Sequence, residues 1–192
     1  RVTFSLYSPE GSRKSKTTDI VPPRSQQDVV LNDLDGFVAD SYGIIKVSYQ
    51  GELRGRVFYY LSDGATGNFQ FAFGAPFVSA TLGKTTVSYN TMQPSLDPSA
   101  AQNQVSNWLS VVNLSTASKQ FTLLEYSSSG ELLKTSELRV PPRGRADVEA
   151  GAGLAPTTGL IQIVPDDSQA GYVAQLMRYG SYSPAGVPAH SY

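Results

Sequence analysis

The sequence contains an internal repeat, and this repeat restricts the possible folds more than any other feature does. Short motifs of the first half return in the second half in the same order, and the two halves align with a single gap. So many ordered matches indicate two copies of one module, produced by duplication. The matched motifs are Tyr7-Ser8 and Tyr126-Ser127, Gly11 and Gly130, 21–24 and 140–143 (both Val-Pro-Pro-Arg), Asp28-Val29 and Asp147-Val148, 43–45 and 159–161, Gly55 and Gly171, Val57 and Val173, and Gly64 and Gly180.

Each copy has the pattern of a series of short strands. Val, Thr, Tyr, Phe, Ser, Gly and Pro are common along the chain, which is typical of strands and turns. Short strands separated by turn signals predict an all-β fold, with two tandem immunoglobulin- or fibronectin-like antiparallel β-sandwich domains. Alternation of apolar and polar residues predicts strands at about 107–114, 120–126, 131–140, 145–149, 159–164 and 171–178, and two more at 68–73 and 85–89.

The repeat also predicts how the chain is divided. Residues 1–92 form a first module with connecting strands, and residues 93–106, which are polar and contain two prolines, form a linker. Residues 107–182 form the second module, and residues 183–192 form a flexible tail. The most hydrophobic strands, 43–47 and 159–163, are expected at the centre of their sheets.

The two copies do not begin and end alike. The second copy opens with a strand around Trp108, whose counterpart would lie before Arg1. The strand that contains Phe69 follows the first copy, and its counterpart at 185–189 is a poor strand. Two interpretations remain open: the chain is a piece of a longer repeat array, or the vacant edge is filled by the strand at Phe69 or by a strand of another chain.

The repeated motifs resemble modules of exported bacterial β-sandwich repeats. Residues 107–115, which end in Asn-Leu-Ser, are followed by Phe121-Thr122-Leu123, a turn at Gly130 and the proline segment that runs to Val148. The sandwich domain of the sensory-rhodopsin-transducer type has a loosely similar order. The resemblance covers both copies and implies a surface or secreted module, but its motifs are structural and imply no functional residues.

Composition excludes several classes of function. A formal net charge of −1 argues against a nucleic-acid-binding protein, which normally has a basic face. The absence of cysteine excludes disulfides, zinc–thiolate sites and a cysteine nucleophile. No apolar run approaches the roughly 20 residues of a membrane-spanning helix. We therefore expect no membrane span, no nucleic-acid partner and no cofactor.

The candidates for catalysis and metal binding have ordinary explanations. His190 lies in a tail rich in Pro, Gly and Ser, which cannot position an imidazole for a catalytic triad. The segment 32–36 (Asn-Asp-Leu-Asp-Gly) resembles the start of a calcium loop, but the closing Glu is absent. No spacing selects an acid pair for glycoside hydrolysis. The acids considered for such a pair are Asp33, Asp35, Asp40, Glu52, Asp97, Asp166 and Asp167.

Two charged features remain. Arg24 with Asp28, and their counterparts Arg143 with Asp147, recur in both copies. We expect each pair to be an ion pair that fixes the proline segment, with a repeated ligand site as the alternative. The basic segment 13–16 is expected to be a solvated strand edge, where lysine discourages aggregation, rather than a contact for an acidic polymer.

Aromatic residues are concentrated in the segment that joins the two copies. Because alternation sends only half of a strand's side chains into one core, the other half faces a second module, a partner or solvent. Tyrosine suits both protein interfaces and stacking on sugars. Three roles remain open for these aromatic residues: they pack in the core and the module–module interface, they contact another chain, or they form a platform for carbohydrate. The candidate interface residues are Phe58, Tyr59, Tyr60, Phe69, Phe71, Phe73, Phe77 and Tyr89.

These observations favour a non-catalytic, extracytoplasmic structural or adhesive protein of the extracellular space or cell surface, such as a surface-layer, fibre or adhesin component. Its partners would be other copies of itself or other surface proteins, with carbohydrate as a further candidate. The alternative is a carbohydrate- or protein-binding module of a secreted multidomain protein. No residue pattern predicts an enzyme.

Overall fold

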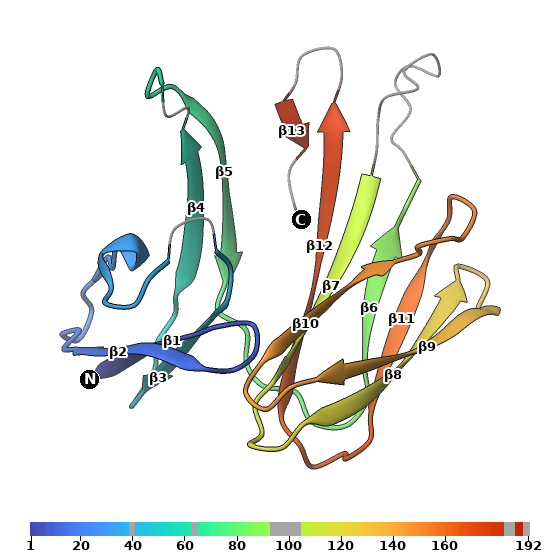
Figure 1. The fold of residues 1–192 in the computed structure, drawn as a ribbon, viewed down its shortest axis with the longest axis horizontal. Coiled ribbons are helices and arrows are strands. Elements are labelled where there is room, and N and C mark those ends of the chain that lie inside the picture. Colours follow the sequence, from blue (N-terminus) through green and yellow to red (C-terminus); the bar gives the residue numbers. More distant parts are fainter. Residues whose placement is uncertain (39–40, 63–64, 93–104, 183–186, 190–192) are drawn as a thin grey trace.

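The chain is an antiparallel all-β protein (Figure 1). The computed structural model describes residues 1–38, 41–62, 65–92, 105–182 and 187–189. No helix in this part of the chain is long and apolar enough to cross a membrane. The strands are β1 (Val2–Tyr7), β2 (Arg13–Asp19), β3 (Ile44–Tyr49), β4 (Arg56–Ser62), β5 (Phe69–Pro76), β6 (Thr85–Asn90), β7 (Val105–Asn113), β8 (Lys119–Ser127), β9 (Leu132–Val140), β10 (Arg145–Ala150), β11 (Thr158–Pro165), β12 (Tyr172–Tyr182) and β13 (Val187–Ala189), with one 3₁₀ turn η1 (Leu31–Asp33).

The second half of the chain forms a sandwich of two four-stranded sheets. One sheet has the order β10-β7-β12-β13 and the other has the order β6-β11-β8-β9. Alternation places Leu109 and Val111 of β7, and Ile161 and Ile163 of β11, in the core between the sheets. The ring of Tyr172 packs edge-on against a second ring of this core, that of Phe121. This half therefore has the closed core that defines a β-sandwich.

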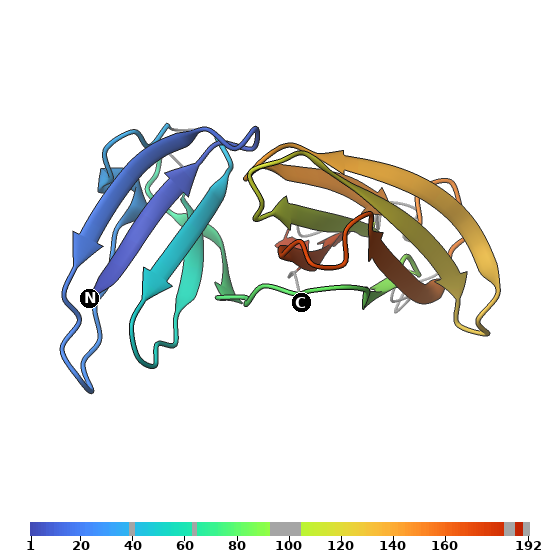
Figure 2. The ribbon, with the colours of Figure 1, turned by 90° about the horizontal axis from the view of Figure 1, so that it is seen from below.

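The first half of the chain is built from a three-stranded sheet and a two-stranded sheet. Their orders are β2-β1-β3 and β4-β5, and Figure 2 shows them as a group separate from the second sandwich. Val2 is the one buried hydrophobic residue that this half contributes among the described side chains. Ile45 and Val47 of β3 are only half-buried. The first module is thus an open arrangement of strands.

The two modules nevertheless pair their strands at the same positions. In the first module, Val2 lies opposite Asp19 on one side and Tyr49 on the other. In the second module, the aligned residue Phe121 lies opposite the aligned partners Leu138 and Pro165. The register shifts between Leu6 and Tyr7 in one module and between Glu125 and Tyr126 in the other, which are also aligned positions. This agreement is what a duplicated module predicts.

The strand that contains Phe69 lies where the opening strand lies in the second module. The carbonyl of Gly171, before β12, accepts a hydrogen bond from the amide of Leu114 at the end of β7. The carbonyl of the aligned residue Gly55, before β4, accepts one from the amide of Phe77 at the end of β5. β5 therefore pairs with β4 in the same way as β7 pairs with β12. Of the fillers considered for the vacant edge, the strand at Phe69 is the one observed.

Other elements differ from the sequence-based expectations. The strand 43–47 was expected to be central, but β3 lies at the edge of its sheet, whereas its counterpart β11 is flanked on both sides. The segment 85–89 was assigned to the first module, but β6 pairs with β11 and so belongs to the second sandwich. A short strand, β13, lies in the segment 183–192 that was expected to be a flexible tail. Most of the expected linker 93–106 lies outside the described residues.

The Val-Pro-Pro-Arg segments form the same turn in both modules. The amide of Gly144 donates to the carbonyl of Pro141, and the amide of Ser25 donates to the carbonyl of Pro22. The arginine in each turn has positive φ, 55° at Arg143 and 62° at Arg24. In the second module this turn carries the chain from β9 in one sheet to β10 in the other, and a crossover is one of the two positions, with a sheet edge, that paired prolines allow.

The modules touch where this turn meets the first hairpin. The amide of Arg145 donates to the carbonyl of Pro9 at 2.7 Å. A Cβ on Gly11 would lie 1.9 Å from the carbonyl oxygen of Pro142, so the close approach requires glycine there. The guanidinium of Arg145 also lies 5.3 Å from the centre of the Tyr42 ring. These contacts join residues that are far apart in the sequence.

Candidate functional site: an aromatic surface on the first module

Three consecutive aromatic residues of β4 are exposed in the first module. Phe58 is 55% exposed, Tyr59 is 48% exposed and Tyr60 is 71% exposed. Because side chains alternate along a strand, Phe58 and Tyr60 lie on one face and Tyr59 lies on the other. The rings of Phe58 and Tyr60 are stacked with centroids 6.4 Å apart and planes at 27°. Phe58 and Tyr60 together are called the β4 aromatic pair below.

The β4 aromatic pair lies on the face that corresponds to the core face of the second module. Phe58 aligns with Ala174 of β12, and Tyr60 aligns with Leu176. Ala174 and Leu176 pack against the closed core of the second sandwich. The same strand position is therefore covered in one module and open to solvent in the other.

Glycines on neighbouring backbone fix the positions of two aromatic rings. A Cβ on Gly74 of β5 would lie 2.8 Å from the ring of Phe58, so this ring rests directly on the backbone of β5. A Cβ on Gly55 would lie 2.0 Å from the ring of Phe77, which is 37% exposed. Both rings are held by their neighbours while keeping a solvent-exposed side.

The remaining predicted interface residues have different positions. Phe69, Phe71 and Phe73 lie on β5, and their side chains are outside the described part of the structure. Tyr89 is buried, with 2% exposure, in the core of the second sandwich, and its hydroxyl donates to the carbonyl of Tyr126. Burial, and then the charge of Glu125, raise the pKa of Tyr89. Tyr89 is thus a core residue in this structure and does not lie on an exposed surface.

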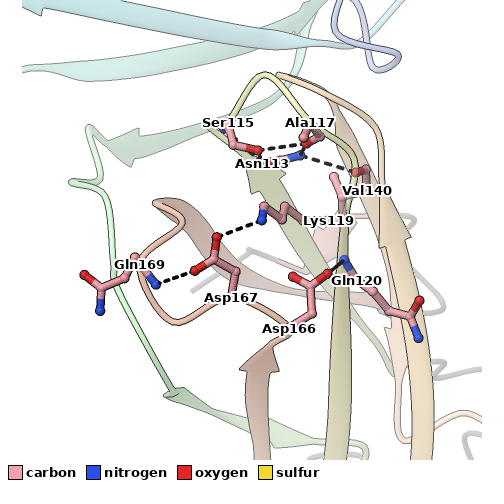
Figure 3. Close-up of polar contacts among 9 residues, drawn as sticks. All are labelled: Asn113, Ser115, Ala117, Lys119, Gln120, Val140, Asp166, Asp167 and Gln169. Carbon is pink, nitrogen blue, oxygen red and sulfur yellow. Dashed lines mark hydrogen bonds and ion pairs between the residues drawn. The ribbon is translucent and has the colours of Figure 1, made fainter.

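Three of the acids considered for catalysis make structural contacts. Asp167 forms an ion pair with Lys119 at 2.8 Å, and Asp166 accepts a hydrogen bond from the amide of Gln120 (Figure 3). The hydrogen bond from Lys119 holds the pKa of Asp167 below its usual value. Glu52 forms a solvent-exposed ion pair with Arg54 at 3.6 Å. Asp40, Asp97 and His190 lie outside the described residues.

The acidic segment 32–36 lies at the short turn η1. Asp33 is the last residue of this turn, and Asp35 follows it in an exposed loop. Within the described residues, no group of three or more His, Cys, Asp or Glu side chains is close enough to hold a metal ion. The structure therefore adds no further ligand to the incomplete calcium pattern.

The predicted ion pairs of the proline segments were wrong in their partners. Asp147 pairs with Arg145 at 2.8 Å and with the hydroxyl of Ser110, rather than with Arg143. In the first module the aligned carboxylate, Asp28, accepts a hydrogen bond from Gln26, which aligns with Arg145. The segment 13–16 lies on β2, where Arg13, Lys14 and Lys16 are exposed, as expected for a solvated strand.

The sequence did not indicate a pocket at the junction of the modules. It has a volume of about 200 Å³, and basic side chains from both modules line it, namely Arg13, Lys46 and Arg143. Arg13 and Arg143 are distant in the sequence, and only the contact between the first hairpin and the proline turn brings them together. Such a pairing has no signal in a single sequence.

The fold and the exposed aromatic surface define an all-β protein with one closed and one open module. No protein-family model matches the chain, and no curated protein matches it. Among solved structures, the Anabaena sensory rhodopsin transducer is similar over 52% of this chain and 97% of that chain, with 17% sequence identity and a TM-score of 0.37. A likeness of this size carries no argument about function.

Proposed function

We propose that this chain is a non-catalytic structural or adhesive protein of the extracellular space or cell surface. In this proposal the open first module makes the contacts with other subunits or surface proteins, and the closed second module serves as its rigid support. The observation that carries the proposal is the exposure of the stacked β4 aromatic pair on a face that is covered in the second module.

The physical argument rests on the cost of leaving large rings in water. Covering a half-exposed aromatic side chain gains about 1–2 kcal/mol, which favours a partner surface over Phe58 and Tyr60. The Phe58 ring already lies against the backbone of Gly74, so a partner would cover only its remaining exposed side. A rigid, exposed aromatic surface is typical of an interface centre.

The test is association of the purified chain in sedimentation experiments, compared with the variant Phe58→Lys. We expect concentration-dependent association of the unchanged chain, and association at least tenfold weaker in Phe58→Lys. Ile20→Lys is the matched control, because Ile20 is also an exposed apolar residue of the first module but lies outside the β4 aromatic pair. A chain that stays monomeric at high concentration and binds no cell surface would overturn the proposal.

A carbohydrate-binding function is the second candidate, and the near-parallel rings of Phe58 and Tyr60 favour it. Two stacked rings with exposed faces provide a flat apolar surface of the kind on which sugar rings stack. In that case Tyr60→Ala should abolish binding to a glycan array, while Ile20→Ala should leave it unchanged. Equal glycan binding by both variants would exclude the β4 aromatic pair as the platform.

A further inference from the structure

We propose that the first module has an acceptor site for one additional β-strand, on its open side between β3 and β4. The incoming strand would be an extended polypeptide segment of the β6 type, with alternating apolar side chains that end in an aromatic residue. This inference rests on the proposed contact function of the first module and names the chemistry of its partner.

The second module shows what such a strand does. β6 pairs antiparallel with β11, with Val87 opposite Ile161 and Tyr89 opposite Gly159. It also lies close to β12 in the facing sheet. Its end is tied to that sheet, because the side-chain amide of Asn107 donates to the carbonyl of Asn90 at 2.8 Å and Arg178 donates to the same carbonyl at 3.2 Å. β6 thus closes one side of the sandwich.

The first module has the acceptor elements of this arrangement but no β6 counterpart among the described residues. β3 aligns with β11, and its sheet ends at β3. The amide of Thr91 donates to the carbonyl of Thr157, so the alternate residues 159, 161 and 163 direct their backbone groups toward β6. The aligned residues Gly43, Ile45 and Val47 therefore direct theirs toward the outer edge of β3, as a row ready to pair with a strand.

The β4 aromatic pair is the second, independent observation. β6 lies beside β12, whose residues Ala174 and Leu176 are packed against the core. On the aligned strand β4, Phe58 and Tyr60 are exposed. The backbone edge of β3 and the side chains of β4 thus lack the same neighbouring strand.

Gly43 leaves the edge of β3 without a side chain at the place where the aromatic end of the incoming strand would lie. In the second module, a Cβ on Gly159 would lie 2.0 Å from the carbonyl oxygen of Tyr126 and 2.9 Å from the ring of Tyr89. A Cβ on Gly43 would lie 2.3 Å from the carbonyl oxygen of Tyr7, the residue aligned with Tyr126. The first module therefore has the same glycine in the same strand contact, opposite the place where an aromatic ring of the partner would lie.

The experiment uses the whole chain and a synthetic peptide with the sequence of residues 83–92. Amide hydrogen exchange should show protection of Ile45 and Val47 when the peptide binds, with no change at Ile161, because β11 already has its own β6. A peptide in which Tyr89 is replaced by Ala should bind at least tenfold more weakly.

Backbone methylation provides a matched control. Val87 and Tyr89 of β6, and Thr91 just after it, direct their backbone groups toward β11. The amide of Asn90 points the other way and donates to the side chain of Asn107. A peptide N-methylated at Val87 should therefore lose binding, and one N-methylated at Ser88 should keep it. Equal binding of the two methylated peptides, or protection confined to β11, would overturn the acceptor site.

The outcomes separate this inference from the proposed function. A chain that remains monomeric but binds the peptide at β3 keeps the acceptor site and rejects subunit association. A chain that associates while the peptide leaves β3 unprotected keeps association and rejects the acceptor site. A third outcome is protection of the β3 amides in the associated chain without peptide, which excess peptide does not remove. In that case the edge of β3 pairs with the β3 edge of a second copy, and the proposed strand is wrong.

Discussion

The two modules of this protein pair their strands in the same way and yet bury very different surfaces. β2-β1-β3 and β9-β8-β11 have the same order, the same register and the same irregularity. The second module encloses a core of buried aliphatic and aromatic residues, while the first leaves the β4 aromatic pair in solvent. Strand register can therefore be the same in two modules that bury different surfaces. Turns and hydrogen-bonded ladders determine the register, whereas the strands that flank each sheet determine whether its core is closed.

A flanking strand accounts for much of the difference. β6 lies between β11 and β12 in the second module, and its Tyr89 fills space beside Gly159. The first module has β5 in place of β7, but its described part has no strand in the position of β6. The missing counterpart of β6 thus leaves one side of the first module open, and the described part of this module also has no counterpart of β10.

The largest expected effect is a contrast between two aromatic truncations. Phe121→Ala in the second core should destabilise the protein by about 3–5 kcal/mol, because it removes a fully buried ring and leaves a cavity. Phe58→Ala should cost less than about 1 kcal/mol, because more than half of this side chain is already in water. Scanning calorimetry measures both changes, and the fluorescence of Trp108, the sole tryptophan, identifies the transition of the second module.

This contrast has a clear contradictory outcome. If Phe58→Ala costs as much as Phe121→Ala, the first module has a closed core in solution and the comparison of the two modules fails. Leu160→Ala serves as a control within the second module, since this side chain is about half exposed on the outer face of β11. Its cost should resemble that of Phe58→Ala.

Much of the strand arrangement followed from the sequence for a physical reason. Alternation in β5 and β6, and the repeated turn residues, are local signals, and local signals determine which residues become strands. Because proline cannot donate to a ladder, the paired prolines restrict their segment to a sheet edge or a crossover between sheets, and the second module has the crossover. The matching register of the two modules agrees with the duplication that the motifs predicted.

The errors concerned which strands become neighbours. β3 is as hydrophobic as a central strand, but its position at the edge depends on a partner strand that local sequence cannot indicate. Tyr89 was named as a candidate interface residue of the first module by its place in the chain, whereas pairing of β6 with β11 carries it into the second core. Asp147 was matched with Arg143 because both residues recur in the two copies, whereas its observed partner is Arg145, two residues away.

A smaller effect is expected from a buried asparagine that only the second module contains. Asn113, at the end of β7, is fully buried and donates to the carbonyl of Ala117 at 2.7 Å (Figure 3). It also donates to the carbonyl of Pro141 at 3.0 Å. Its side-chain oxygen accepts from the amide of Ser115 at 2.9 Å. Asn113→Ala should cost about 2–3 kcal/mol, because buried backbone groups lose their partners.

Urea unfolding followed by Trp108 fluorescence measures this loss. The exposed Asn32 of the first module provides the control, and Asn32→Ala should change the stability by less than about 0.5 kcal/mol. At the end of β5, the position corresponding to Asn113 is Pro76, which has no side-chain amide. If Asn113→Ala is neutral, the loop that follows β7 is held by other contacts, and this asparagine does not explain the order of the second module.

The smallest effect tests the one strained feature that both modules share. Arg24 and Arg143 occupy the third position of equivalent proline turns with positive φ, where a residue with a Cβ is strained by about 1–2 kcal/mol. Glycine relieves this strain but loses about 0.5–1 kcal/mol through the greater freedom of the unfolded chain. Arg143→Gly should therefore stabilise the second module by roughly 0.5 kcal/mol, measured as a shift of the Trp108 unfolding transition.

Arg24→Gly should leave this transition unchanged, because its turn lies in the open module. A stabilisation of the second transition by Arg24→Gly would instead show that the two modules unfold as one unit, since the strain of one turn would then be shared by both.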